Sequence, residues 1–188
     1  MSGKQRLRLL IPLVLLSFSC ESEYSKLMKA ELAKDVRYDS LFFGIELGQD
    51  KKEYFEICWD WHKKGVLGSS GRSNYVQYDM VSKDTFPKVL MHFYPETDAY
   101  NKISEMDVLF DYSAWGPWSK TYGSEALLPV VLDTLQSWYQ GNKFLNVELD
   151  NKEDVWIKVD GNRRIAVRIK DERYVQAKIT DLLNESTK

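Results

Sequence analysis

The feature that most constrains the fold is a switch between two hydrophobic periods, which occurs twice along the chain. Apolar residues from 54 to 61 recur at spacings of three and four, as on one face of a helix. The segments that follow alternate apolar and polar side chains, which is the period of half-buried strands. The same order begins again with a helix over about 124–140. The predicted strands are 75–80, 88–94 and 103–112, and then 144–149, 155–159, 164–169 and 174–180.

Local signals support these boundaries. Asp50 and Glu53 form a capping-box pair before the first long helix, and Gly65 ends it. Asp160-Gly161-Asn162 is a hairpin signal between two predicted strands. Residues 65–73 are predicted to be a turn, because the spacing of their glycines does not fit a phosphate-binding loop.

This order of elements predicts an α+β fold. We expect two consecutive helix-then-antiparallel-strands units, with the helices packed on one face of an antiparallel sheet. The units are placed at about 38–114 and 115–188, within a single α+β domain that spans 38–188. One face of the sheet is predicted to be apolar, and the other is predicted to carry Lys158, Arg168, Lys170 and Gln176.

The first nineteen residues resemble a secretory signal peptide. Lys4, Arg6 and Arg8 form a basic region that contains no acidic residue, and the apolar run 9–16 follows it. This run is shorter than the ~20 apolar residues that cross a bilayer core, and Pro12 interrupts it. We therefore expect residues 1–19 to be cleaved and the rest of the chain to leave the cytoplasm.

The residues before Cys20 resemble a lipobox, which implies that the Cys20 thiol carries lipid and becomes the mature N-terminus. Ser17 stands where a lipobox usually has Leu, and Phe18 is bulkier than the usual residue at its position. The alternative is ordinary cleavage after Ser19, which leaves Cys20 as a free thiol. Two or more acyl chains such as palmitate anchor a protein stably. Because Glu21 is not the Asp of inner-membrane retention, the resemblance implies an outer-membrane lipoprotein.

The lipid would hold residues 20–37 as a short tether and helix close to the membrane.

Cleavage removes three basic residues and takes the formal net charge from −2 to −5. A mildly acidic domain gives no electrostatic reason to expect nucleic acid as a partner. Cys58 is then the one remaining cysteine, and we expect it to be a small buried residue on a helix face. If Cys20 is not lipidated, a disulfide between Cys20 and Cys58 can form in an oxidising compartment.

The stretch 45–53 has an apolar residue, a Gly turn, a polar cap and then a helix. In this it resembles the SmpA/OmlA-type lipoproteins of outer-membrane β-barrel assembly, although Gln49 stands where that family usually has Met. Two successive helix-then-strands units on a secreted chain also resemble the β-lactamase inhibitor protein fold. The chain is similar as well to uncharacterised small lipoproteins of Gram-negative anaerobes, from which no activity can be carried over. The resemblance implies binding to other proteins rather than catalysis.

Aromatic residues gather around Gly116-Pro117, between the two predicted units. Trp and Tyr are enriched at binding hot spots, because they supply a large contact area with little loss of entropy. The alternative is that this loop packs across the sheet with its rings in the core. Trp59 lies off the apolar stripe of its helix and is a further candidate. The candidate binding residues are therefore Trp115, Trp118, Tyr112, Tyr122 and Trp59.

The sequence alone contains no recognisable catalytic, metal or cofactor motif. Cys58 and His62 lie four residues apart but make only a pair, whereas a zinc site needs a cluster of ligands. We therefore expect no cofactor and no enzymatic activity. The predicted function is that of a lipid-anchored protein-binding or structural accessory module of the cell envelope, with an envelope protein as partner. The alternative is a small-molecule or glycan binder that uses the aromatic loop.

Overall fold

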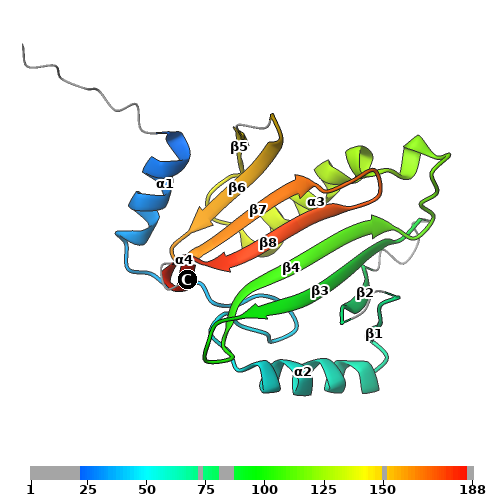
Figure 1. Cartoon of the computed structure of the whole chain (residues 1–188), viewed down its shortest axis with the longest axis horizontal. Helices are drawn as coiled ribbons and strands as arrows, with labels where there is room; N and C mark the ends of the chain where they lie inside the picture. The colour runs from blue at the N-terminus through cyan, green and yellow to red at the C-terminus, as the bar shows by residue number, and fades with distance from the viewer. Residues whose placement is uncertain (1–21, 72–73, 81–86, 150–151, 186–188) are drawn as a thin grey trace, which may run out of the picture.

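The computed structural model describes residues 22–71, 74–80, 87–149 and 152–185. Over these residues the protein is α+β, with an eight-stranded antiparallel sheet in the order β1-β2-β3-β4-β8-β7-β6-β5 (Figure 1). The helices are α1 (Glu23–Leu32), α2 (Lys51–Lys63), α3 (Ser124–Tyr139) and α4 (Leu182–Glu185), with a 3₁₀ turn η1 (Lys120–Tyr122). The strands are β1 (Leu67–Ser69), β2 (Val76–Met80), β3 (Val89–Thr97), β4 (Ile103–Tyr112), β5 (Leu145–Glu148), β6 (Asp154–Asp160), β7 (Arg163–Ile169) and β8 (Val175–Asp181).

The pairing of β4 with β8 joins the two halves of the sheet. Val108 lies opposite Ala177 in this antiparallel pair, and each half then continues outward by neighbouring strands. Figure 1 shows β4 and β8 side by side at the centre, with the earlier strands on one side and β5 to β7 on the other. The segments predicted to be strands are all strands, and β1 is an additional short one inside the stretch predicted to be a turn.

The main core lies between the sheet and the helices α2 and α3. On β4, Met106, Val108 and Phe110 are buried in this core, and the residues between them face the other way. Helix α2 contributes Tyr54 and Cys58. Helix α3 contributes Leu127, Leu128, Val131 and Leu135. The apolar faces of the helices and the apolar faces of the alternating strands therefore meet in one layer.

Helix α1 packs in a second, smaller cluster. This cluster joins Leu27 and Met28 to Val155, Ile157 and Val159 of β6. Because successive strand residues face opposite ways, Trp156 points into the main core while its neighbours point toward α1. The expectation that the helices pack on one face of the sheet is therefore not confirmed, since α1 covers the opposite face of β6.

Lys158 was predicted to lie on the polar face of the sheet, and this prediction is wrong. Its register partner is the core residue Ile165, and it is fully buried on the face covered by α3. By contrast, Arg168 and Gln176 are register partners on the other face. Lys158 Nζ donates to the carbonyl oxygens of Gln140 and Asn142, directly after α3. A cation suits this position because the carbonyls at the end of a helix carry partial negative charge.

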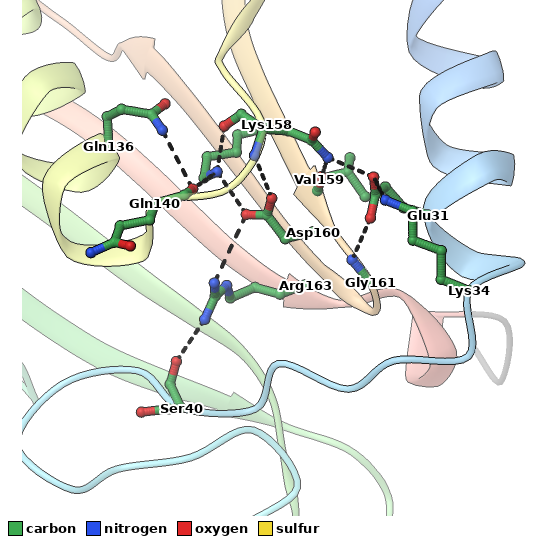
Figure 2. A network of polar contacts seen from close by, with 11 residues as sticks. Glu31, Lys34, Ser40, Gln136, Gln140, Lys158, Val159, Asp160, Gly161 and Arg163 are labelled. Carbon is green, nitrogen blue, oxygen red and sulfur yellow. Dashed lines mark hydrogen bonds and ion pairs between the residues drawn. The ribbon is translucent and has the colours of Figure 1, made fainter.

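A network of buried polar groups surrounds Lys158 and ties the N-terminal segment to the sheet (Figure 2). Lys158 Nζ lies 2.7 Å from Asp160 Oδ2, and the other oxygen of Asp160 accepts from the backbone N–H of Asn142 at 2.8 Å. The Arg163 guanidinium stacks over the Tyr139 ring at 4.3 Å and donates to the carbonyl of Ser40 at 2.9 Å. Burial lowers the pKa of Arg163, although the neighbouring Tyr139 and Asp160 oppose that effect.

Glu31 fixes the end of α1 to the turn between β6 and β7. Its carboxylate accepts the backbone N–H of Gly161 at 3.1 Å and the Asn142 amide at 2.6 Å. Gly161 has a positive φ of 53°, and an added Cβ there would lie 2.1 Å from the carbonyl oxygen of Val36. The predicted hairpin at 160–162 is thus confirmed, and its glycine also allows the N-terminal segment to pass closely over the turn.

The predicted bounds of α2 and its cap at Asp50 are confirmed, but among the described residues Glu53 does not make the return hydrogen bond of a capping box. The Asp50 side chain accepts from the backbone N–H of Lys52 at 2.9 Å, and Gly65 follows the helix with a φ of 71°. Among the helices of the described ranges, none is long and apolar enough to cross a membrane. Cys20 and the predicted signal peptide lie outside the described residues.

Candidate functional site

The aromatic loop predicted from the sequence connects β4 to η1 and α3. Trp118 is 88% exposed and lies against Gly116, where an added Cβ would be 2.8 Å from its ring. Trp115 is half-buried. The alternative in which the loop buries its rings in the core therefore does not hold for Trp118.

Tyr112 and Tyr122 lie at the base of this loop. Their rings meet edge to face with centroids 5.7 Å apart, and both side chains are half-buried. Burial, with a smaller effect from Tyr122, raises the pKa of Tyr112. The two tyrosines therefore brace the loop where it leaves β4, and the broad exposed surface belongs to Trp118.

A groove of about 380 Å³ lies beside the loop. Trp115, Gly116 and Pro117 form one side of it, and Glu125 and Glu172 bring carboxylates to the same space. An aromatic ring and hydrogen-bond acceptors in one groove form a chemical combination that suits a polar ligand with a flat apolar face.

Arg173 connects this loop to the polar face of the sheet. Its guanidinium carbon lies 5.1 Å from the Trp115 ring and 4.8 Å from the Tyr174 ring. Its Nε and Nη2 lie 2.7 Å and 2.6 Å from Oδ2 of Asp111, a carboxylate with no solvent exposure. The position of Trp115 is therefore tied to a charged pair at the end of β4.

Asp111 also binds His92, which in turn contacts Ser70. The Nε2 atom of His92 lies 2.9 Å from Asp111 Oδ1, and its Nδ1 atom lies 2.8 Å from Ser70 Oγ. In the register of β3 and β4, Leu90 is opposite Asp111 and His92 is two residues further along, on the same face. A continuous line of contacts thus runs from Ser70 through His92, Asp111 and Arg173 to the aromatic loop. The five residues in this line are Ser70, His92, Asp111, Arg173 and Trp115.

Asp107 forms a second buried polar group on the same face of the sheet. Its two carboxylate oxygens accept from the Tyr75 hydroxyl at 2.5 Å and from the Gln176 amide at 2.6 Å. A carboxylate loses its hydrogen bonds to water when it is buried, and these two donors take their place. This face is therefore polar in composition and ordered by direct hydrogen bonds.

A larger groove of about 570 Å³ lies where α2 faces the turn between β1 and β2. Phe55 and Trp59 line it from the helix and are 51% and 61% exposed, and Ser70 lines it from the turn. Trp59 stacks on His62 with ring centroids 5.6 Å apart. The structure thus places the predicted residue Trp59 at this groove, apart from the aromatic loop.

Cys58 also lines this groove but is buried in the main core as a free thiol. Burial raises the pKa of Cys58 to about 11, and the neighbouring Tyr54 side chain has a smaller effect in the opposite direction. The thiol is therefore protonated at neutral pH, which does not favour reactivity. This agrees with the expectation of a small buried residue.

Sequence reasoning missed Ser70, His92, Asp111 and Arg173 as a group. His92 and Asp111 lie on predicted strands, where period-two alternation places each of them on a polar face. Their proximity depends on the register between β3 and β4, and no turn motif in the sequence fixes that register.

Within the described ranges there is no cluster of three or more His, Cys, Asp or Glu side chains that could hold a metal ion. Comparison of the chain with protein-family models, curated proteins and solved structures finds no match.

Proposed function

We propose that the protein is a lipid-anchored module of the cell envelope that binds another envelope protein through its aromatic loop. The observation that supports this most strongly is Trp118, which is 88% exposed in a loop braced on both sides. The basic and apolar segments before Cys20 support export and the lipid anchor, and Glu21 after it supports an outer-membrane location.

The loop combines exposure with order, and this favours a binding role. An indole that is already positioned loses little further freedom when a partner covers it, so more of its buried area contributes to affinity. Arg173 holds Trp115 from one side, and the Tyr112–Tyr122 pair holds the base of the loop. Trp118 therefore acts as the anchor residue of the interface.

The architecture is consistent with this role. We propose that the chain consists of two helix-then-strands units, about 38–114 and 115–188, and the aromatic loop lies at their junction. In the β-lactamase inhibitor protein fold, which this arrangement resembles, the implied role is binding to another protein.

Quantitative affinity capture tests the proposal. Tagged wild-type protein and Trp118→Ala are expressed in the native host, and envelope partners retained after mild cross-linking are quantified by mass spectrometry. Trp138→Ala is the matched control, because Trp138 is an exposed tryptophan on α3. We expect Trp118→Ala to recover at least tenfold less of one specific partner than wild type does. A tenfold loss of affinity corresponds to ~1.4 kcal/mol of binding free energy. Equal recovery from both variants would contradict the proposal.

The lipid anchor has a separate test. Metabolic labelling with an alkyne fatty acid is expected to mark the wild-type protein and leave Cys20→Ser unlabelled and released from membranes. An unmodified Cys20 in the mass of the mature N-terminus would remove the anchor from the account.

The groove beside the loop favours a second function, binding of a glycan. Trp115 offers a stacking face there, and Glu125 and Glu172 offer acceptors for sugar hydroxyls. Titration of oligosaccharides while tryptophan fluorescence is recorded tests this function. A saturable change that Trp115→Phe weakens and Glu172→Gln abolishes is expected for a glycan binder. A flat titration across the sugars would exclude it for those ligands.

A further inference from the structure

We propose that Ser70, His92 and Asp111 form a nucleophilic serine site that hydrolyses carboxylic esters with an apolar acyl group. This activity goes beyond the proposed binding function and uses a different surface, the groove between α2 and the β1–β2 turn. The residues that carry it come from three separate segments: the turn after β1, strand β3 and strand β4.

The hydrogen-bond order of the three side chains is that of an activated serine. Ser70 Oγ lies 2.8 Å from one ring nitrogen of His92, and Asp111 Oδ1 lies 2.9 Å from the other. A nucleophile, a base and a group that orients the base form the arrangement by which serine hydroxyls become reactive. In the usual serine triad the hydroxyl faces Nε2 of the histidine and the carboxylate faces Nδ1. Here Ser70 faces Nδ1 and Asp111 faces Nε2, and each group keeps the same role.

Asp111 fixes the tautomer of the imidazole. A buried carboxylate that is ionised accepts hydrogen bonds and donates none, so the His92 nitrogen beside it carries the proton. The opposite nitrogen, Nδ1, then has a lone pair directed at the Ser70 hydroxyl, which donates to it. Arg173 places a cation beside the Asp111 carboxylate, which has no solvent exposure, through contacts of 2.6 and 2.7 Å.

Ser70 differs from its two partners in exposure. His92 and Asp111 are buried, whereas Ser70 is half-buried and lines the groove of about 570 Å³. The opposite wall of this groove carries Phe55 and Trp59, both more than half exposed. A reactive hydroxyl facing an aromatic wall fits an ester whose acyl part is apolar, because that part removes water from the rings when it binds. Asn74 also lines the groove, and a side-chain amide is one of the groups that can stabilise an oxyanion.

The reaction balances without a further reagent. Ser70 Oγ bonds to the ester carbonyl carbon while its proton passes to His92 Nδ1. The bond from that carbon to the alkoxy oxygen then breaks, and the alcohol leaves with the proton from His92. Water attacks the acyl-serine, giving its proton to His92, and the carboxylic acid departs as Ser70 recovers its proton.

The test uses the full chain, a fluorophosphonate probe and p-nitrophenyl butyrate. We expect a stoichiometric phosphonyl adduct on the peptide that contains Ser70, together with ester hydrolysis that Ser70→Ala abolishes. Ser137→Ala, a change at an exposed serine on α3, is the matched control and should leave both signals unchanged. His92→Gln should reduce the labelling rate about 100-fold or more, as expected for loss of a general base.

Circular dichroism and urea unfolding establish that each variant is folded before its labelling is interpreted. A folded wild-type protein without an adduct on Ser70 would overturn the proposal, as would an unchanged labelling rate in folded His92→Gln. Trp118→Ala should label normally. Its effect on partner capture therefore reports on the binding function alone, and the two proposals can fail separately.

Discussion

Arg173 binds Asp111 through two nitrogens on one carboxylate oxygen, at 2.7 and 2.6 Å, while its guanidinium stacks on Trp115. One arginine therefore links the buried end of β4 to the aromatic loop. The loop that we assign to partner binding and the His92–Asp111 pair share this residue. A change at Arg173 is expected to affect both, whereas a change at Trp118 affects the loop only.

Arg173→Gln should destabilise the protein by about 2 kcal/mol, because it leaves the buried Asp111 carboxylate with fewer donors. Urea unfolding followed by circular dichroism measures this free energy. Lys88→Gln is the control, because it breaks an exposed ion pair with Asp79 that is worth at most ~1 kcal/mol. Equal losses in the two variants would show that the Arg173–Asp111 contact contributes no more than a surface pair.

Lys158→Met should be more damaging, with a loss of about 3 kcal/mol or more, because it removes the cation 2.7 Å from the buried Asp160 carboxylate and leaves only the longer contact of 3.9 Å with Arg163. It also removes the donor to the carbonyls that follow α3. Thermal unfolding compares it with Lys178→Met, which breaks the half-exposed pair with Glu105. A lowered melting temperature in Lys178→Met but not in Lys158→Met would argue against the buried network.

Gly161→Ala should destabilise the fold by about 2 kcal/mol or more, because a strained positive φ is combined with a close contact to Val36. Gly65→Ala separates the two effects, since Gly65 has a φ of 71° but open space around its Cβ position. We therefore expect Gly65→Ala to be the milder change in equilibrium unfolding. Equal stability of the two variants would contradict the close packing of the N-terminal segment over this turn.

Glu31 makes stability depend on acid pH. Burial alone would raise the pKa of Glu31, but hydrogen bonds from Lys34, Gly161 and Asn142 together lower it below its ordinary value of 4.5. A lowered folded-state pKa adds stability above pH 4.5, and this contribution is lost as the pH falls through the folded value. Urea unfolding from pH 6 down to pH 3 should show a shallower decline for Glu31→Gln than for wild type. Parallel curves would show that Glu31 is not linked to folding.

Much of the fold follows from periodicity, because every predicted strand needs one apolar face to cover the core. The rule fails at Lys158, where a cation pairs with Asp160 and helix-end carbonyls in the interior. Hydropathy treats lysine as a surface residue and contains no information about such partners. It also gives no indication that α1 packs on the face of β6 opposite to α3, since either face of the sheet accepts an amphipathic helix.

The candidate site was predictable in part for a related reason. A cluster of aromatic residues around Gly116-Pro117 is visible in the sequence, and the exposure of Trp118 agrees with the interpretation of that cluster as a surface. Ser70, His92 and Asp111 lie far apart along the chain. The register of β3 and β4 brings His92 to Asp111, and the turn after β1 brings Ser70 to His92. Because the sequence pattern is compatible with several registers, this contact required the three-dimensional structure.

Site-specific photo-cross-linking in living cells is the most direct test of partner binding. A benzoylphenylalanine residue is introduced in place of Trp118 and, as the matched control, in place of Trp138. Because aromatic substitution keeps a large ring at position 118, binding should persist, and irradiation should give one discrete adduct with an envelope protein from position 118 only. No adduct from position 118, or the same adducts from both positions, would contradict the assignment of the aromatic loop as the binding surface.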